Sequence, residues 1–151
     1  MSVPPFTDVA LLKEFMFAGK AKLTIRSEKT GTHYTYKIRK DKDSDTWWVH
    51  RLSGQSAYVY LGTIFGGERF KATRRTAGIY KTCPSFKAFE WFYRRLIDDN
   101  EIPPNLTVYH EGKCGMCGRE LTDPVSVAEG YGPECRRTRL RRGIINDKTP
   151  A

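Results

Sequence analysis

The chain has 151 residues, 39% of them hydrophobic and 13% aromatic, which is enough apolar surface for a folded core and excludes a disordered chain. Lysine and arginine total 26 against 17 acidic residues, so the formal net charge is +9 and the composition favours an acidic partner. No apolar run approaches the ~18–20 residues of a membrane span. The N-terminus lacks the basic and apolar regions of a secretory signal, so we expect a soluble, cytoplasmic protein.

The first element is predicted to be a helix. Thr7 or Asp8 is suited to cap its N-terminus, and Gly19 is suited to end it. Spacings of three and four residues place the apolar side chains on one face, as expected of a helix that packs on a core. These side chains are Val9, Leu12, Phe15 and Met16.

A block of strand-like segments follows, in which β-branched and aromatic residues alternate with polar ones. Turn residues separate the segments, including a hairpin signal at residues 53–56 and the glycine pair at 66–67. We expect four or five antiparallel strands, the last being a short return after the glycine pair. The segments are residues 23–27, 32–40, 46–52, 57–65 and 68–74.

A second helix is predicted after Pro84, where the apolar spacing changes to three and four residues. Ser85 is suited to cap this helix, and the polar residues 98–100 are suited to end it. Residues 106–110 are predicted to form a short strand that leads into a cysteine-containing segment. The broad apolar face of the helix is formed by Phe86, Phe89, Trp91 or Phe92, Leu96 and Ile97.

Three of the four cysteines, Cys114, Cys117 and Cys135, lie close together in the sequence, whereas Cys83 stands alone. A disulfide framework would usually spread its pairs through the chain, so this spacing indicates metal ligation. The C-x2-C pair, with glycine inside and after it, is typical of a zinc knuckle. We expect one structural Zn²⁺ with four tetrahedral ligands, the fourth being His110 or, if the fold brings it alongside, Cys83.

The fold class is therefore α+β: an N-terminal helix, a four- to five-stranded antiparallel sheet, a packing helix and a small C-terminal module of the zinc-knuckle or treble-clef-like kind. We expect the α+β body at residues 1–105, the zinc-stapled module with an arginine-rich helix at 106–145, and a disordered tail at 146–151.

The run from His110 to Cys135, H-x-G-x-C-x2-C-G-R-x-L-T-D-P-x-S-V-x2-G-x-G-P-x-C, resembles a C-terminal zinc-binding signature. It is similar to that of a family of small, largely uncharacterised proteins from bacteriophages and actinobacteria, a domain of unknown function. The upstream segments TGTHYTYKIRK, YVYLGTIF and PSFKAFEWFYRRL are also similar to members of that family. The resemblance implies one zinc, His110 as a ligand and a phage or bacterial setting, and it implies no reaction.

A run of arginines directly follows the last cysteine and is predicted to lie on a helix. Arginine is suited to bidentate contact with phosphate, although a basic helix end also complements the helix dipole and forms salt bridges. The run comprises Arg136, Arg137, Arg139, Arg141 and Arg142.

A second basic group lies on the predicted strands, interleaved with aromatic residues, a pattern typical of proteins that bind single-stranded nucleic acid. Strand alternation must also bury about half of these aromatics in the core. Trp47 and Trp48 point to opposite faces, and we take Trp48 as the exposed candidate for stacking on bases. The candidate contacts on the strands are Lys37, Arg39, Arg51, Arg74, Arg75 and Trp48.

These features predict a non-enzymatic protein that binds DNA or RNA and has an accessory or regulatory role in a phage or a bacterial cell. The alternative is an inhibitor or interaction module that binds a host protein, which an exposed apolar patch without basic neighbours would favour. A nucleic-acid-processing enzyme is less favoured, because the sequence contains no Walker loop, no zinc-deaminase signature and no paired-carboxylate pattern.

Overall fold

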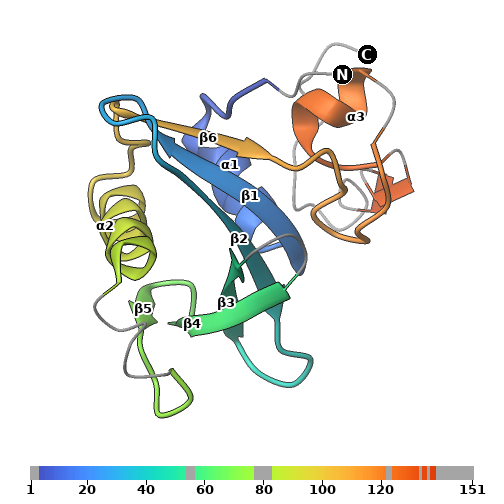
Figure 1. The fold of residues 1–151 in the computed structure, drawn as a ribbon. Coiled ribbons are helices and arrows are strands. Elements are labelled where there is room, and N and C mark those ends of the chain that lie inside the picture. Colours follow the sequence, from blue (N-terminus) through green and yellow to red (C-terminus); the bar gives the residue numbers. More distant parts are fainter. Residues whose placement is uncertain are drawn as a thin grey trace.

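The structure is a computed structural model that describes residues 4–53, 57–76, 83–121, 124–132, 134, 135, 137 and 138. It has the predicted α+β class, with a curled, fully antiparallel sheet in the order β5-β4-β3-β2-β1-β6 (Figure 1). The strands are β1 Lys20–Ser27, β2 His33–Lys40, β3 Thr46–Ser53, β4 Ala57–Phe65, β5 Arg69–Lys71 and β6 Leu106–His110. The helices are α1 Val9–Met16, α2 Pro84–Asp98 and α3 Pro124–Glu129.

The sheet has six strands, which corrects the expected four or five. The additional member is β6, which was predicted as a strand but not as part of the sheet. It pairs antiparallel with β1, from Leu23 opposite His110 to Ser27 opposite Leu106. This pairing satisfies the backbone groups of β1, which would otherwise lie at an edge. It also places the end of β6, where the cysteine segment begins, beside the middle of β1.

One face of the sheet, the covered face, carries the hydrophobic core. Alternate residues of the strands, such as Leu23, Tyr36 and Val49, are fully buried there. Helix α2 packs Phe89 against the ring of Tyr36, with centroids 4.9 Å apart. Next to α1, the Phe17 carbonyl accepts a hydrogen bond from Trp47 Nε1 at 3.2 Å. Both helices therefore cover the same face.

The opposite side, the open face, carries the residues that alternate with the core. Trp47 and Trp48 do point to opposite faces: Trp47 is buried and Trp48 is only half-buried.

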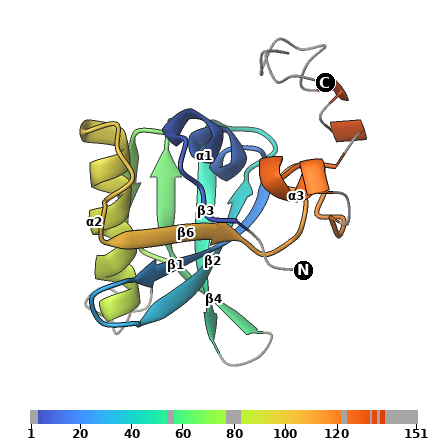
Figure 2. The same cartoon turned by 90° about the horizontal axis from the view of Figure 1, so that it is seen from above.

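Helices α2 and α3 lie at opposite ends of β6 (Figure 2). No helix in the described ranges combines the length and apolar character needed to cross a membrane.

The helix termini follow their local sequence. The carboxylate of Asp8 caps α1 by accepting from Ala10 N at 2.9 Å, as predicted. In α2, the expected cap Ser85 lies inside the first turn and is fully buried, and Cys83 is the N-cap without a side-chain cap bond. The reason is Pro84, whose fixed φ suits the first helical position and moves the N-cap back by two residues, from Ser85 to Cys83.

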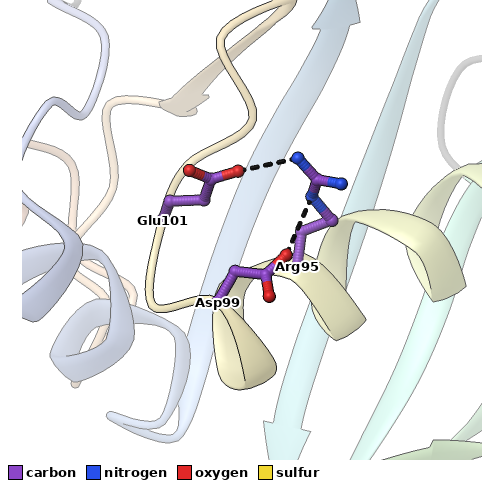
Figure 3. A network of polar contacts seen from close by, with 3 residues as sticks. All are labelled: Arg95, Asp99 and Glu101. Atoms are coloured by element: carbon purple, nitrogen blue, oxygen red, sulfur yellow. Dashed lines mark hydrogen bonds and ion pairs between the residues drawn. The ribbon is translucent and has the colours of Figure 1, made fainter.

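The end of α2 is fixed by charge pairing. The Arg95 guanidinium contacts Asp99 at 3.2 Å and Glu101 at 2.8 Å, joining the helix to the segment that leads to β6 (Figure 3). Residue Asn100 between them has a positive φ of 51°. The polar residues at 98–100 thus end the helix as predicted.

The predicted turns have mixed outcomes. Gly66 and Gly67 turn the chain between β4 and β5 with φ values of 62° and 72°, which favour glycine. The return strand is shorter than residues 68–74, because β5 covers Arg69–Lys71 alone. Residues 54–56 of the predicted hairpin turn and the tail at 146–151 lie outside the described residues.

Candidate metal centre and the adjoining basic pocket

Three thiols converge at one end of the sheet. The sulfur atoms of Cys114, Cys117 and Cys135 all lie within 4.8 Å of one another, and this is the one such group among the described ranges. None of the four cysteines forms a disulfide. Thiolate donors select soft or borderline ions such as Zn²⁺, so this thiol cluster has the chemistry of a metal site.

The C-x2-C segment is a small hairpin that turns around the first thiol. Lys113 and Glu120 form an isolated antiparallel bridge at its base. Within the turn, the amides of Met116 and Cys117 donate to Cys114 Sγ at 3.4 and 3.5 Å. These N–H···S bonds are the knuckle geometry that the spacing predicted.

The titration of the thiols follows from this geometry. Burial opposes ionisation of Cys114, but the backbone amides of Cys117, Gly132 and Met116 hold its pKa below the ordinary value. Burial and hydrogen bonds from the other two thiols raise the pKa of Cys135. Three thiolates this close repel one another unless a cation lies between them, so the donor set fits a bound metal ion.

The hairpin is held against the body by close backbone packing. Lys20 N, at the start of β1, donates to Gly115 O at 2.8 Å, and Gly115 N donates to Gly130 O at 2.9 Å. A Cβ on Gly115 would lie 2.6 Å from the Phe15 ring, and one on Gly130 would lie 2.8 Å from it. Helix α1 therefore packs directly on both glycines, and it connects the thiol cluster to the core.

His110, the first candidate for the fourth ligand, lies outside the thiol cluster. It is 1% exposed, its Nδ1 accepts from Gly112 N at 2.9 Å, and its Nε2 faces Val127 O. Both ring nitrogens are thus bound to backbone, and His110 is not part of the thiol cluster. It connects β6 to α3 instead, packed against the rings of Phe6 and Phe15.

Cys83, the rival fourth ligand, lies elsewhere. It precedes α2, where its Sγ lies 3.1 Å from Ser85 Oγ. Since α2 and α3 lie at opposite ends of β6, the fold does not bring Cys83 alongside the cluster (Figure 1). In this arrangement neither His110 nor Cys83 lies in the thiol cluster, and the fourth ligand stays a prediction.

A basic pocket of about 290 Å³ adjoins the thiol cluster on the open face. Its lining contains five cations and two residues of the cysteine hairpin. They are Lys20, Lys22, Lys37, Arg39 and Lys113, with Cys117 and Gly118. The β1–β2 register explains the convergence, because Lys20 pairs with Arg39 and Lys22 pairs with Lys37 across the two strands.

These cations form no ion pair with an acidic residue in the part of the chain that the structure describes. The ion pairs found within the described ranges both belong to Arg95, on the other side of the molecule. Burial and the charges of Lys22 and Arg39 lower the pKa of Lys37. The nearby carboxylate of Glu111 instead accepts from Thr24 Oγ1, one of the uncharged side chains on this face. The pocket is therefore a site of unbalanced positive charge.

The predicted contact residues divide into three groups. Lys37, Arg39 and Trp48 lie on the open face, and Arg74 and Arg75 are exposed beside Trp48. Arg51 pairs with the buried Tyr36 and therefore lies on the covered face, away from the others. Arg137 is exposed on a helical segment, and four arginines lie outside the described residues. These four are Arg136, Arg139, Arg141 and Arg142.

Sequence reasoning missed Lys20, Lys22 and Lys113. The signal for the first two was present, because Lys20 and Lys22 alternate with buried Ala21 and Leu23 in the manner of a strand. The predicted strand began at Leu23, which left both lysines out. Lys113 carries no comparable signal, since its position depends on how the cysteine hairpin packs.

Residues 104–140, which include β6, the cysteine hairpin and α3, match the family of unknown function DUF6011. A search of curated proteins gave no match. A search of solved structures gave none either. The match covers the thiol cluster and one cation of the basic pocket, Lys113, so this part of the chain is an uncharacterised domain.

Proposed function

We propose that this protein binds nucleic acid through its open face and carries one structural zinc ion in the thiol cluster. The observation that carries the proposal is the basic pocket, in which five cations meet and no acidic residue is found among the described lining residues. Like charges at this separation repel, so their convergence costs stability unless an anion binds between them. A phosphate backbone is such an anion, and it is the dominant source of affinity in nucleic-acid binding.

The zinc has a positioning role in this proposal. Cys117 and Gly118 form one wall of the basic pocket, and Lys113 projects from the same hairpin. An ion bound by three thiolates would fix that hairpin against β1 and hold the wall in place. Tetrahedral zinc takes a fourth ligand, for which the thiol cluster leaves one position. In the sequence, the arginines at 136–142 follow Cys135 directly and add positive charge to this part of the chain.

The test is the salt dependence of oligonucleotide binding, followed by fluorescence anisotropy. Three lysines of the basic pocket, Lys20, Lys22 and Lys37, are replaced by glutamine. The slope of log K against log salt falls by about 2 for single strands if each lysine contacts one phosphate. The control replaces three exposed lysines elsewhere, Lys29, Lys42 and Lys87, with the same loss of net charge. Equal slopes in the two triple variants would contradict the proposal.

A protein partner is the second candidate function, and it has its own observation. Trp91 is 40% exposed on α2 and lines a cavity of about 260 Å³ that has no lysine or arginine among its described lining residues. An exposed ring beside such a cavity favours an interaction module, although Trp91 does have one basic neighbour, the Arg95 guanidinium, 5.6 Å from the centre of its ring. Recovery of one stoichiometric protein after nuclease treatment, lost in Trp91→Ser but kept in the triple lysine variant, would support this candidate.

A further inference from the structure

A second cavity, the aromatic pocket, opens on the open face beyond β3. Its volume is about 600 Å³, within the range of small-molecule sites. Trp48, Tyr60 and Phe65 contribute aromatic surface to its lining, and Arg74 and Arg75 contribute charge. Phe65 is 43% exposed, so an apolar ring at this site remains in contact with solvent.

A β-bulge shapes this pocket. His50 pairs with Tyr60, but Val49 pairs with Gly62, so β4 contains one extra residue at this point. In a regular strand Tyr60 and Thr63 would point to opposite faces, yet here their hydroxyls lie 2.5 Å apart and both line the pocket. The bulge therefore brings the Tyr60 ring to the face that carries Trp48.

The two arginines belong to a fixed turn. Thr73 Oγ1 lies 2.9 Å from Tyr60 Oη, and Thr73 N donates to Thr76 Oγ1 at 3.0 Å. The Thr76 hydroxyl in turn donates to Leu61 O at 2.9 Å and is buried. The backbone of the turn is thus bound to β4, and Arg74 and Arg75 project from it at the rim of the pocket.

The aromatic pocket and the basic pocket are neighbours. Arg39 of the basic pocket pairs with Trp48 of the aromatic pocket, and Lys37 pairs with His50, across β2 and β3. Three strand spacings separate β1 from β4, about 14 Å. Positively charged side chains therefore line the open face from the cysteine hairpin to the edge of the aromatic pocket, and Arg74 and Arg75 add positive charge on its far side.

We propose that the aromatic pocket takes an unpaired base, so that the protein selects single-stranded over double-stranded nucleic acid. This inference rests on the proposed function. Phosphates on either side of the base would contact Arg74 and Arg75 at one rim and the basic pocket at the other. A duplex keeps its bases stacked inside, so it presents phosphate to the same face but no base to the pocket. Stacking on aromatic side chains is the part of the interaction that a duplex cannot supply.

The experiment separates bases from phosphates. Anisotropy is measured for a labelled dT12 strand, a 12-residue abasic strand with the same phosphates, and a 12-base-pair duplex. We expect dT12 to bind at least tenfold more tightly than the abasic strand. Trp48→Leu should weaken dT12 binding roughly 10- to 100-fold and leave the abasic strand unchanged. The matched control, Trp91→Leu, removes an equally large ring on α2 and should change neither.

The outcomes are distinguishable. Equal affinity for dT12 and the abasic strand overturns the base pocket and leaves the phosphate-binding function intact. A duplex that binds as tightly as dT12 also overturns it. Binding of neither strand at low salt removes the proposed function and this inference with it. If Trp48→Leu does not fold, Phe65→Ser and the double variant Arg74→Gln/Arg75→Gln test the same pocket with exposed residues, and unchanged dT12 binding in both overturns the inference.

Discussion

The two faces of the sheet are built from alternate residues of the same strands, yet they differ in how their polar and charged groups are matched. On the covered face, Tyr36 is fully buried and its hydroxyl donates to Ser85 O at 2.7 Å. On the open face, its neighbour Lys37 lies among other cations and its nearest aromatic contact is the Tyr58 ring, 4.6 Å away. Adjacent residues of β2 therefore differ. The hydroxyl of Tyr36 has a hydrogen-bond partner in the interior, whereas the ammonium group of Lys37 has no ion-pair partner among the described residues.

A second contrast concerns the cations themselves. Arg95 has two carboxylates within 3.2 Å, whereas the cations of the basic pocket have none among the described residues at ion-pair distance (Figure 3). Five such cations lie together in the basic pocket, and this clustering is the basis for proposing an anionic partner at the open face.

Metal removal should have the largest effect on the open face, because the cysteine hairpin forms one wall of its basic pocket. A chelator, or Cys114→Ser, should unfold the cysteine hairpin and open the wall of the basic pocket, because structural zinc supplies on the order of 10 kcal/mol in small zinc-binding units. Metal content and the thermal unfolding curve measure the effect. Cys83→Ser is the control and should keep both unchanged, since Cys83 lies outside the thiol cluster. A protein that keeps its unfolding temperature after complete metal removal would contradict a structural ion.

A substitution in the core of the covered face should have the next largest effect, and it should lower stability. Phe89 is fully buried and packs on the rings of Tyr36, Phe70, Phe92 and Tyr93. Phe89→Ala should lower the free energy of unfolding by about 3–5 kcal/mol. Denaturant unfolding measures this loss. Oligonucleotide affinity of the folded fraction should not change, and a specific loss of affinity would mean that the two faces are coupled.

Much of the fold could be predicted because local sequence and tertiary packing agree. Asp8 caps α1, the glycine pair turns β4 into β5, and alternation places Trp47 inside and Trp48 outside, as the pattern indicated. The partner of β6 could not be predicted, because the pairing of β1 with a strand some 80 residues later depends on the whole fold. The helix α3 was also missed, since six residues are too few for a periodic signal.

In the candidate site, too, features set by local sequence could be predicted, and features set by tertiary packing could not. The C-x2-C spacing predicted two members of the thiol cluster, Cys114 and Cys117, because the constraint lies within a short turn, and Cys135 joins them from further along the chain. His110 was the natural fourth candidate by its distance in sequence, but its ring nitrogens are used by Gly112 and Val127. Which nitrogen meets which backbone group depends on where α3 packs, and no spacing rule encodes that. The basic pocket required the β1–β2 register, which follows only once both ends of β1 are known.

His50 should make oligonucleotide binding at the open face moderately dependent on pH. Burial, and then the charges of Lys37 and Arg39, lower its pKa from the ordinary 6.5, so the free protein favours neutral His50. Its contribution to stability is present above pH 6.5 and is lost as the pH falls toward the lowered pKa. Phosphates on the neighbouring cations would raise that pKa, so dT12 binding should tighten by up to about tenfold between pH 7 and 5.5.

Anisotropy across this pH range in wild type, His50→Gln and His33→Gln tests the prediction. His33 is an exposed histidine at the start of β2 and serves as the control. His50→Gln should remove the change and His33→Gln should retain it. The same change in all three proteins would assign it to groups other than His50.

The smallest expected effects are the changes in the free energy of unfolding caused by Arg95→Gln and Lys37→Gln. The direction of each change is more informative than its size. Arg95→Gln breaks two partly exposed ion pairs and should lower the free energy of unfolding by less than about 1 kcal/mol. Lys37→Gln removes one cation from a group of five and should leave stability unchanged or raise it slightly, because the remaining charges repel less. Denaturant unfolding at low and high salt measures both, and salt should reduce both changes. A loss of stability in Lys37→Gln equal to that in Arg95→Gln would show that the cations of the open face are matched within the fold, and the main argument for an anionic ligand would then fail.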